Sequence, residues 1–128
     1  MQQGAKANLN GWTFEAECES LLEEHGIEFE SQVPYTNIYG SNRSKMDIVV
    51  GDLYIECKFQ EVGGSVDEKI PFVMENLEQF PKGMIILGGN HWKGERGQLI
   101  YEYINSSRYK AEAVYFEEFV ERVEQGLI

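Results

Sequence analysis

The sequence predicts an α/β protein in which helices flank a mixed central β-sheet. Two apolar strands separated by Gly51-Asp52 indicate a β-hairpin, because these residues favour a two-residue turn. Residues 83–89 hold a short, continuous apolar run, which is typical of a buried central strand. A helical pattern lies between the hairpin and this strand, so a crossover and a parallel strand pair are expected beside the hairpin. The length of 128 residues suits one domain, residues 1–128.

The N-terminal part predicts a helix followed by a first strand. Residues 11–26 form the expected helix, because Gly26 favours a helix end and apolar residues recur at helical spacing, namely Phe14, Cys18, Leu21 and Leu22. Residues 27–39 supply a first strand and the approach to the hairpin. Pairing of the hairpin strands through the tight turn would then place Asp47 directly opposite Glu56.

The two faces of the hairpin differ, because strand side chains alternate. One face is apolar and suits a core; it consists of Met46, Ile48, Val50, Leu53, Ile55, Cys57 and Phe59. The other face carries Lys45, Asp47, Val49, Tyr54, Glu56, Lys58 and Gln60. Such polar residues are ordinary on a solvated hairpin face, but like charges opposite each other destabilise a sheet by about 0.2–1 kcal/mol. A divalent cation would reverse that repulsion, since Mg²⁺ takes carboxylate ligands and leaves its remaining positions to water and phosphate.

The C-terminal half predicts two helices and further strands. After a loop at Gly63-Gly64, residues 70–80 have one apolar helical face, with Pro71 in the first turn. The glycine-rich residues 88–97 are expected to form a flexible, exposed loop, in which His91 and Trp92 either contact nucleic acid or have no such role. Strands are expected at 99–104 and 113–116, and an amphipathic closing helix at 116–127.

Composition excludes several classes of protein. The two cysteines, Cys18 and Cys57, fall on apolar faces, which favours buried reduced thiols over a disulfide. No apolar run is as long as a membrane span and the N-terminus lacks a signal-peptide core, so a soluble, cytoplasmic protein without membrane contact is expected. The two histidines are far apart in sequence, which gives a zinc hydrolase little support.

The hairpin motif resembles the core of a known nuclease superfamily. Asp47 followed, after a short hairpin, by Glu56-Cys57-Lys58 is similar to the motif of the PD-(D/E)xK nucleases, which include restriction endonuclease-like and Holliday junction resolvase-like proteins. The helix start at residues 11–15 and the loop and helix start at 63–72 also resemble that superfamily. Met46 stands where the family name has Pro, a position that varies. The resemblance implies a restriction endonuclease-like sandwich.

The resemblance also implies a metal-dependent site. Asp47 and Glu56 would hold one or two Mg²⁺, with Mn²⁺ as a substitute, and the main-chain carbonyl of Cys57 would add a ligand. Lys58 would orient the attacking water or stabilise the transition state. Glu15 is implied as an auxiliary ligand or water holder, and Gln60 as a residue that positions substrate or water.

The implied function is a metal-dependent endodeoxyribonuclease of the restriction, homing or phage type. Alternatives of the same fold are a structure-specific Holliday junction resolvase and a non-catalytic DNA-binding or assembly subunit. An acidic protein-interaction domain without a nucleic-acid role is a further alternative. A homodimer or higher homo-oligomer is expected in the nuclease case, because cutting two strands requires two active sites.

Charge is the main objection to a DNA substrate, because the net charge is −11 and DNA affinity rests on Lys and Arg. The basic residues are unevenly distributed, however. Arg43 and Lys45 precede the motif, and Lys93 and Arg96 lie in a late segment with few acidic neighbours. These four residues are the predicted nucleic-acid contacts. We therefore expect a locally positive face on an acidic body.

Overall fold

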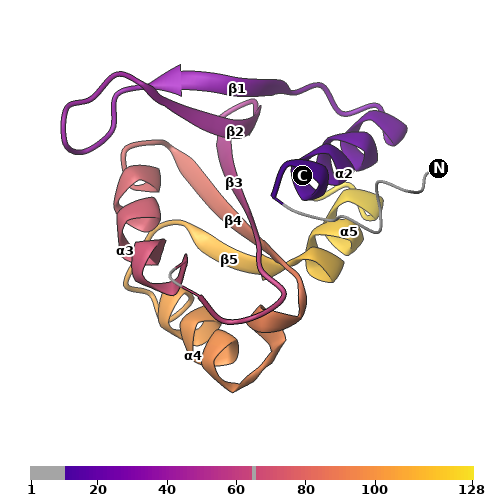
Figure 1. Cartoon of the computed structure of the whole chain (residues 1–128). Helices are drawn as coiled ribbons and strands as arrows, with labels where there is room; N and C mark the ends of the chain where they lie inside the picture. The colour runs from indigo at the N-terminus through magenta and orange to yellow at the C-terminus, as the bar shows by residue number, and fades with distance from the viewer. Residues whose placement is uncertain (1–10, 65) are drawn as a thin grey trace.

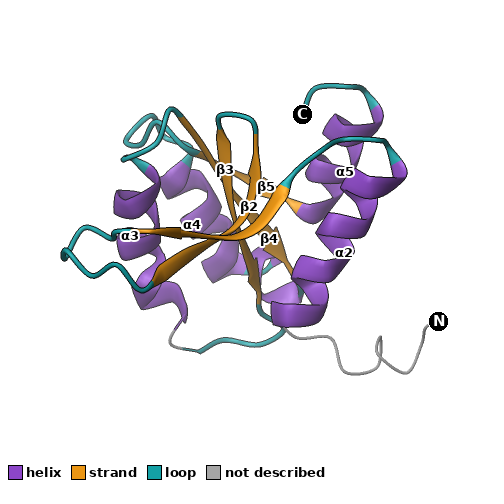
Figure 2. Ribbon diagram, turned by 90° about the horizontal axis from the view of Figure 1, so that it is seen from above, coloured by secondary structure: helices purple, strands orange, loops and turns teal. Residues whose placement is uncertain are grey.

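The computed structural model describes residues 11–64 and 66–128 and contains a five-stranded sheet with helices on both faces (Figures 1 and 2). In chain order the elements are α2 (Gly11–Glu24), β1 (Glu30–Tyr35), β2 (Ser44–Val50), β3 (Leu53–Phe59), α3 (Val66–Leu77), β4 (Lys82–Gly88), the 3₁₀ helix η1 (Asn90–Lys93), α4 (Glu95–Ile104), β5 (Glu112–Tyr115) and α5 (Phe116–Glu124). Within this part of the chain, no helix has the length and hydrophobicity of a membrane span.

The sheet is mixed, as the sequence predicts. Its strand order is β1-β2-β3-β4-β5, with antiparallel pairs β1·β2 and β2·β3 and parallel pairs β3·β4 and β4·β5. Helix α3 provides the crossover from β3 to β4, and Figure 1 shows α3 and α4 on one face of the sheet and α2 and α5 on the other. The α/β sandwich is confirmed.

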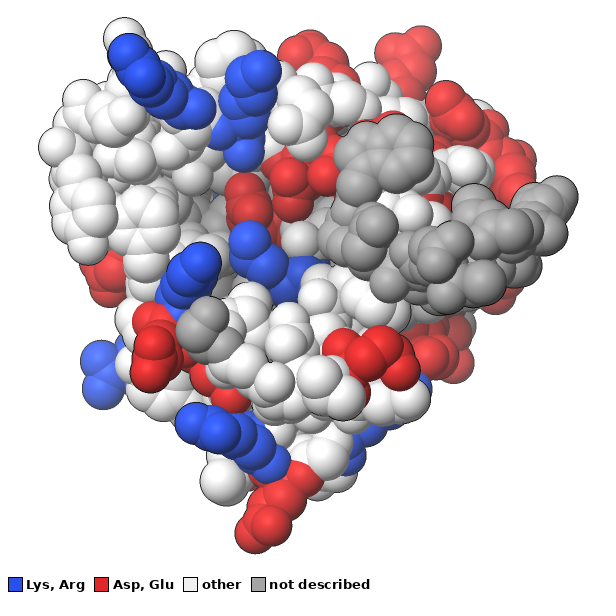
Figure 3. All heavy atoms as spheres, in the orientation of Figure 1, with Lys and Arg blue, Asp and Glu red and all other residues white. Residues whose placement is uncertain are grey.

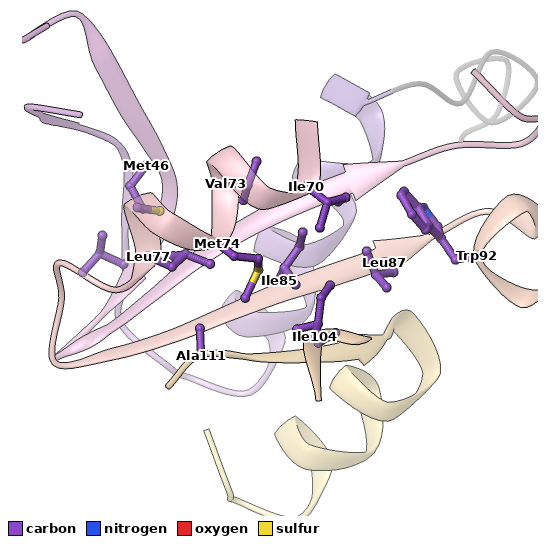
Figure 4. Close-up of a cluster of buried hydrophobic side chains, with 12 residues drawn as sticks. Met46, Ile70, Val73, Met74, Leu77, Ile85, Leu87, Trp92, Ile104 and Ala111 are labelled. Atoms are coloured by element: carbon purple, nitrogen blue, oxygen red, sulfur yellow. The ribbon is translucent and has the colours of Figure 1, made fainter. Parts of the chain in front are cut away.

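The core has one layer on each face of the sheet, and β4 contributes to both. Ile85 and Leu87 pack with Met74, Trp92 and Ile104 under α3 and α4 (Figure 4). The alternate residues of β4, Met84 and Ile86, pack with the residues of α2 and α5, among them Phe14, Cys18, Phe119 and Val123. Each fully buried aliphatic side chain of this kind contributes about 1.5–3 kcal/mol. The continuous apolar pattern of β4 therefore follows from helices on both sides.

The predicted strand at residues 99–104 is wrong, because these residues belong to α4. Ile100 and Ile104 pack against the core at helical spacing. Gly97 allows the helix to approach η1 closely, since a Cβ at this position would lie only 2.3 Å from the backbone of His91 and Trp92. A short apolar run fits a strand or a helix equally well, and here packing decides.

The predicted flexible loop at residues 88–97 is also wrong. Its centre is η1, and Trp92 in η1 is fully buried. His91 is held by Asp67, with its Nε2 2.8 Å from Asp67 Oδ1 and both side chains nearly buried. Trp92 therefore serves the core, and His91 joins η1 to the start of α3.

The hairpin turn follows the prediction, but one hairpin side chain changes face. Val50 pairs with Leu53, Val49 with Tyr54 and Ile48 with Ile55 as expected, and Gly51 has the positive φ of 60° that the turn requires. Met46, however, packs under α3 together with Val49, whereas Ile48 lies on the α2 side. Strict alternation therefore fails between Met46 and Ile48, at Asp47.

Candidate active site

A cleft opens between the hairpin and α3, with a volume of about 260 Å³. Glu56 and Lys58 of β3 line it because residues two apart in a strand face the same side. The remaining lining residues come from β1, β2 and α3: Tyr35, Ser44, Lys45, Lys69, Phe72, Val73 and Asn76. Figure 3 shows a hollow on this face where acidic and basic side chains meet. The cleft therefore combines one buried carboxylate with three lysines.

Asp47 lies at a break in the sheet. The β1·β2 pairs Ser31↔Ile48 and Val33↔Met46 flank a position where Gln32 and Asp47 do not pair, and Gln32 has a positive φ of 52°. The β2·β3 pairing also stops one step before Asp47. The predicted cross-strand pair of Asp47 with Glu56 is therefore not formed, although the register of the preceding pairs is the expected one.

The side chain of Asp47 replaces a backbone partner at this break. The Cys57 backbone N–H donates to Asp47 Oδ2 at 2.8 Å, and Gln32 Nε2 donates to Oδ1 at 3.4 Å. Asp47 is thus held in place by one main-chain and one side-chain donor. Its charge still acts on Glu56, as the pKa of Glu56 shows.

Helix α2 brings Glu15 to the same cluster. Gln32 Nε2 donates to Glu15 Oε2 at 2.6 Å, so the Gln32 amide lies between the carboxylates of Glu15 and Asp47. Sequence reasoning missed Gln32. Its backbone conformation and position depend on the break between β1 and β2, and no local pattern reports that break.

The charge of Asp47 acts on both Glu15 and Glu56. Burial, followed by the charge of Asp47, raises the pKa of Glu56 to about 8, although Lys58 opposes this shift. Burial and then Asp47 also raise the pKa of Glu15 to about 7. The nearest cation to Glu56 is Lys58, with Nζ 3.7 Å from Glu56 Oε1. The side chains of the protein therefore do not fully neutralise the negative charge of Glu15, Asp47 and Glu56. Such clusters are typical of functional sites.

The donor set fits a hard divalent cation held by two carboxylates. Asp47 and Glu56 offer oxygen ligands, and their repulsion would be relieved by a positive charge between them. The residues that the structure describes contain no group of three or more His, Cys, Asp and Glu side chains suited to holding a metal. Two carboxylates are a donor set of the kind that a divalent cation accepts when water and substrate oxygens supply its further ligands.

The other predicted site residues lie in different surroundings. Gln60 Nε2 donates to the Val62 carbonyl at 2.5 Å, so its side chain is directed into the following loop. Lys93 pairs with Glu117 at 2.9 Å and Arg96 with Asp67 at 2.9 Å, and neither lines the cleft.

Lys45 does line the cleft, and Arg43 is exposed in the loop that precedes it. Lys69 was missed as a basic group at the site, because only the packing of α3 brings it there. None of the ion pairs found within residues 11–64 and 66–128 involves Arg43, Lys45 or Lys69.

A mixed α/β sandwich with an Asp on one hairpin strand and Glu-x-Lys on the next defines a class of nucleases. A family model described as a PD-(D/E)XK nuclease superfamily domain matches residues 6–124, and the chain belongs to this superfamily. The solved structure titled "Crystal Structure of Protein of Unknown Function AF1548" is similar in fold, with a TM-score of 0.53 and 16% identity over 91% of this chain and 67% of that one. No curated protein gives a significant match.

Proposed function

We propose that the protein is a metal-dependent endodeoxyribonuclease that hydrolyses DNA phosphodiester bonds at the cleft beside α3. The observation that carries this proposal is the pKa of Glu56, raised by burial and by the charge of Asp47, next to Lys58 in a cleft that two further lysines line. Folding gains nothing from a buried carboxylate with a raised pKa. Metal-assisted hydrolysis of a phosphodiester uses this combination of cation ligands and a positive side chain.

In this proposal Asp47 and Glu56 hold Mg²⁺, or Mn²⁺ in its place, with the Cys57 main-chain carbonyl as a further ligand. The bound cation would lower the pKa of a water molecule and stabilise negative charge on the phosphate. The Cys57 N–H and the Gln32 amide hold the Asp47 carboxylate in a fixed orientation. These contacts favour a preorganised site over one that forms only with substrate.

Lys58 has the most direct role in the reaction. Its side chain is partly exposed while that of Glu56 is nearly buried, so the ammonium can reach both the carboxylate and an incoming phosphate. We assign it to orienting the attacking water and stabilising charge on the phosphate. Glu15, whose pKa is raised to about 7, is assigned to holding a water or accepting a proton near neutral pH.

DNA is the proposed substrate despite the net charge of −11. Arg43, Lys45 and Lys69 lie at or near the cleft without carboxylate partners among the described residues, which leaves them available for phosphate oxygens. Binding should be weak, because few cations are available, and sensitive to salt, because those cations contact phosphate. Two copies of the chain would provide the two sites needed to cut both strands, so a homo-oligomer forms part of the proposal.

The test is cleavage of supercoiled plasmid with Mg²⁺, with Mn²⁺ and with excess chelator. We expect nicking or linearisation with either metal and none with chelator. Glu56→Gln and Lys58→Ala should lose cleavage by at least about 100-fold, the range for a group that acts on the transition state. Lys82→Ala is the matched control, because Lys82 is exposed at the far end of the sheet beside Asp52. Full activity in Lys58→Ala would remove Lys58 from the mechanism.

A further inference from the structure

The loop between β1 and β2 presents an exposed aromatic ring beside the cleft. Tyr39 is 80% exposed and Ile38, its neighbour, 42%. One face of the Tyr39 ring stacks on Phe72 of α3, with ring centroids 5.0 Å apart and an interplanar angle of 30°. Phe72 itself lines the cleft. Tyr39 therefore extends one wall of the cleft outward and keeps its second face open to solvent.

The loop is held rigidly in this conformation. Asn37 Oδ1 accepts the backbone N–H groups of Tyr39 at 2.9 Å and Ser41 at 3.2 Å, and the Asn37 backbone closes the turn with Ser41 and Gly40. The buried Asn76 of α3 accepts the Ile38 N–H at 2.9 Å. These bonds hold the backbone at Tyr39 in place without a ligand, which lowers the entropy cost of binding.

The surroundings of Tyr39 are uncharged on one side and basic on the other. Figure 3 shows an uncharged area over the β1–β2 loop and α3, adjoining the hollow with its basic groups. Arg43 lies in the same loop, and Lys45 and Lys69 line the cleft next to Phe72. A flat apolar surface next to cations without carboxylate partners matches a nucleic-acid strand, which has a base to stack and phosphates to neutralise.

We propose that Tyr39, backed by Phe72, is a stacking platform for an unpaired base, and that the substrate is DNA with a single-stranded segment next to the point of cleavage. This inference rests on the proposed nuclease function. A base inside a duplex already has both faces covered by its neighbours, so only an unpaired base or a strand end can present a face to Tyr39. The backbone of the same strand would then enter the cleft past Lys45 and Lys69.

Two matched DNA substrates test the proposal: a fully paired duplex and the same duplex with a short unpaired segment. We expect wild-type protein to cleave the second with the higher kcat/KM. Tyr39→Ala should reduce kcat/KM on it by about ten-fold, as for the loss of one stacked base, and leave the paired duplex unchanged. Tyr39→Phe should retain wild-type values, because stacking needs the ring and not the hydroxyl. Tyr103→Ala is the control, an exposed tyrosine on α4.

A binding measurement separates this inference from the nuclease proposal. A single-stranded oligonucleotide that contains 2-aminopurine, with chelator present to prevent cleavage, should lose fluorescence on binding wild type and Tyr39→Phe but not Tyr39→Ala. If wild type cleaves no DNA yet shows this quenching, the nuclease function fails and the platform stands. An equal loss of cleavage on both substrates in Tyr39→Ala, or unchanged quenching, overturns the platform. If Tyr39→Ala changes only the oligomeric state seen in gel filtration, the loop is an interface between copies, and the platform is also overturned.

Discussion

Replacing Glu56 by Gln should stabilise the metal-free protein in a pH-dependent manner. Burial and Asp47 raise the pKa of Glu56 from 4.5 to about 8, so the folded protein binds this proton more tightly than the unfolded chain. The resulting stability is fully present below pH 4.5 and is lost as the pH rises towards 8. The loss accumulates at about 1.4 kcal/mol per pH unit, which gives at most about 3.5 kcal/mol at pH 7. Gln at position 56 stays neutral, so the variant does not lose this stability as the pH rises.

The assay is urea unfolding followed by circular dichroism, with chelator present, at several values between pH 4.5 and pH 8. The free energy of unfolding should differ little between wild type and Glu56→Gln at pH 4.5, and the variant should be the more stable by at most about 4 kcal/mol near pH 8. Glu124→Gln, at an exposed position at the end of α5, should show no such trend. A constant difference at every pH, or a variant less stable at pH 8, would refute the account of Glu56 as a strained carboxyl group.

Three further predictions concern metal, DNA and packing. Mg²⁺ at pH 8 should raise the melting temperature of wild type and do so much less in Glu56→Gln; an equal rise in both would exclude Glu56 as a ligand. Lys45→Ala and Lys69→Ala should each weaken DNA binding and reduce the slope of log K against log salt by about one, while Lys82→Ala should change neither. Gly97→Ala should destabilise the fold by about 1–3 kcal/mol in urea unfolding, because its Cβ would meet the η1 backbone; unchanged stability would contradict that close contact.

The part of the fold that could be predicted is the part that local sequence determines. The turn at Gly51-Asp52 and the alternation on both sides of it specify the hairpin, and the apolar run of β4 specifies a buried strand. Residues 99–104 could not be assigned in this way, because their pattern suits a helix or a strand until Gly97 packs against η1. Trp92 likewise has a glycine-rich sequence context that suggests exposure, and only its packing in the cluster formed with α3, β4 and α4 buries it.

The arrangement of the candidate site follows from local sequence only in part. Glu56 and Lys58 share one face of β3 because of strand periodicity alone, and the structure places both in the cleft. The position of Asp47 depends on the break opposite Gln32, which involves strand β1 and helix α2 and leaves no local signal. Lys69 reaches the cleft through α3, so its contribution follows from tertiary structure.

The hydrogen bond from Cys57 to Asp47 makes the aspartate part of the framework of the sheet as well as of its chemistry. Alanine at position 47 would remove the acceptor for the Cys57 N–H, and an unsatisfied buried N–H costs about 1–3 kcal/mol. A loss of cleavage in Asp47→Ala would then have two causes, namely the missing metal ligand and the lost hydrogen bond to strand β3. Asn keeps an oxygen acceptor in the same place and removes only the charge. The sheet and the reaction centre thus share one carboxylate, and selection on either function constrains the other.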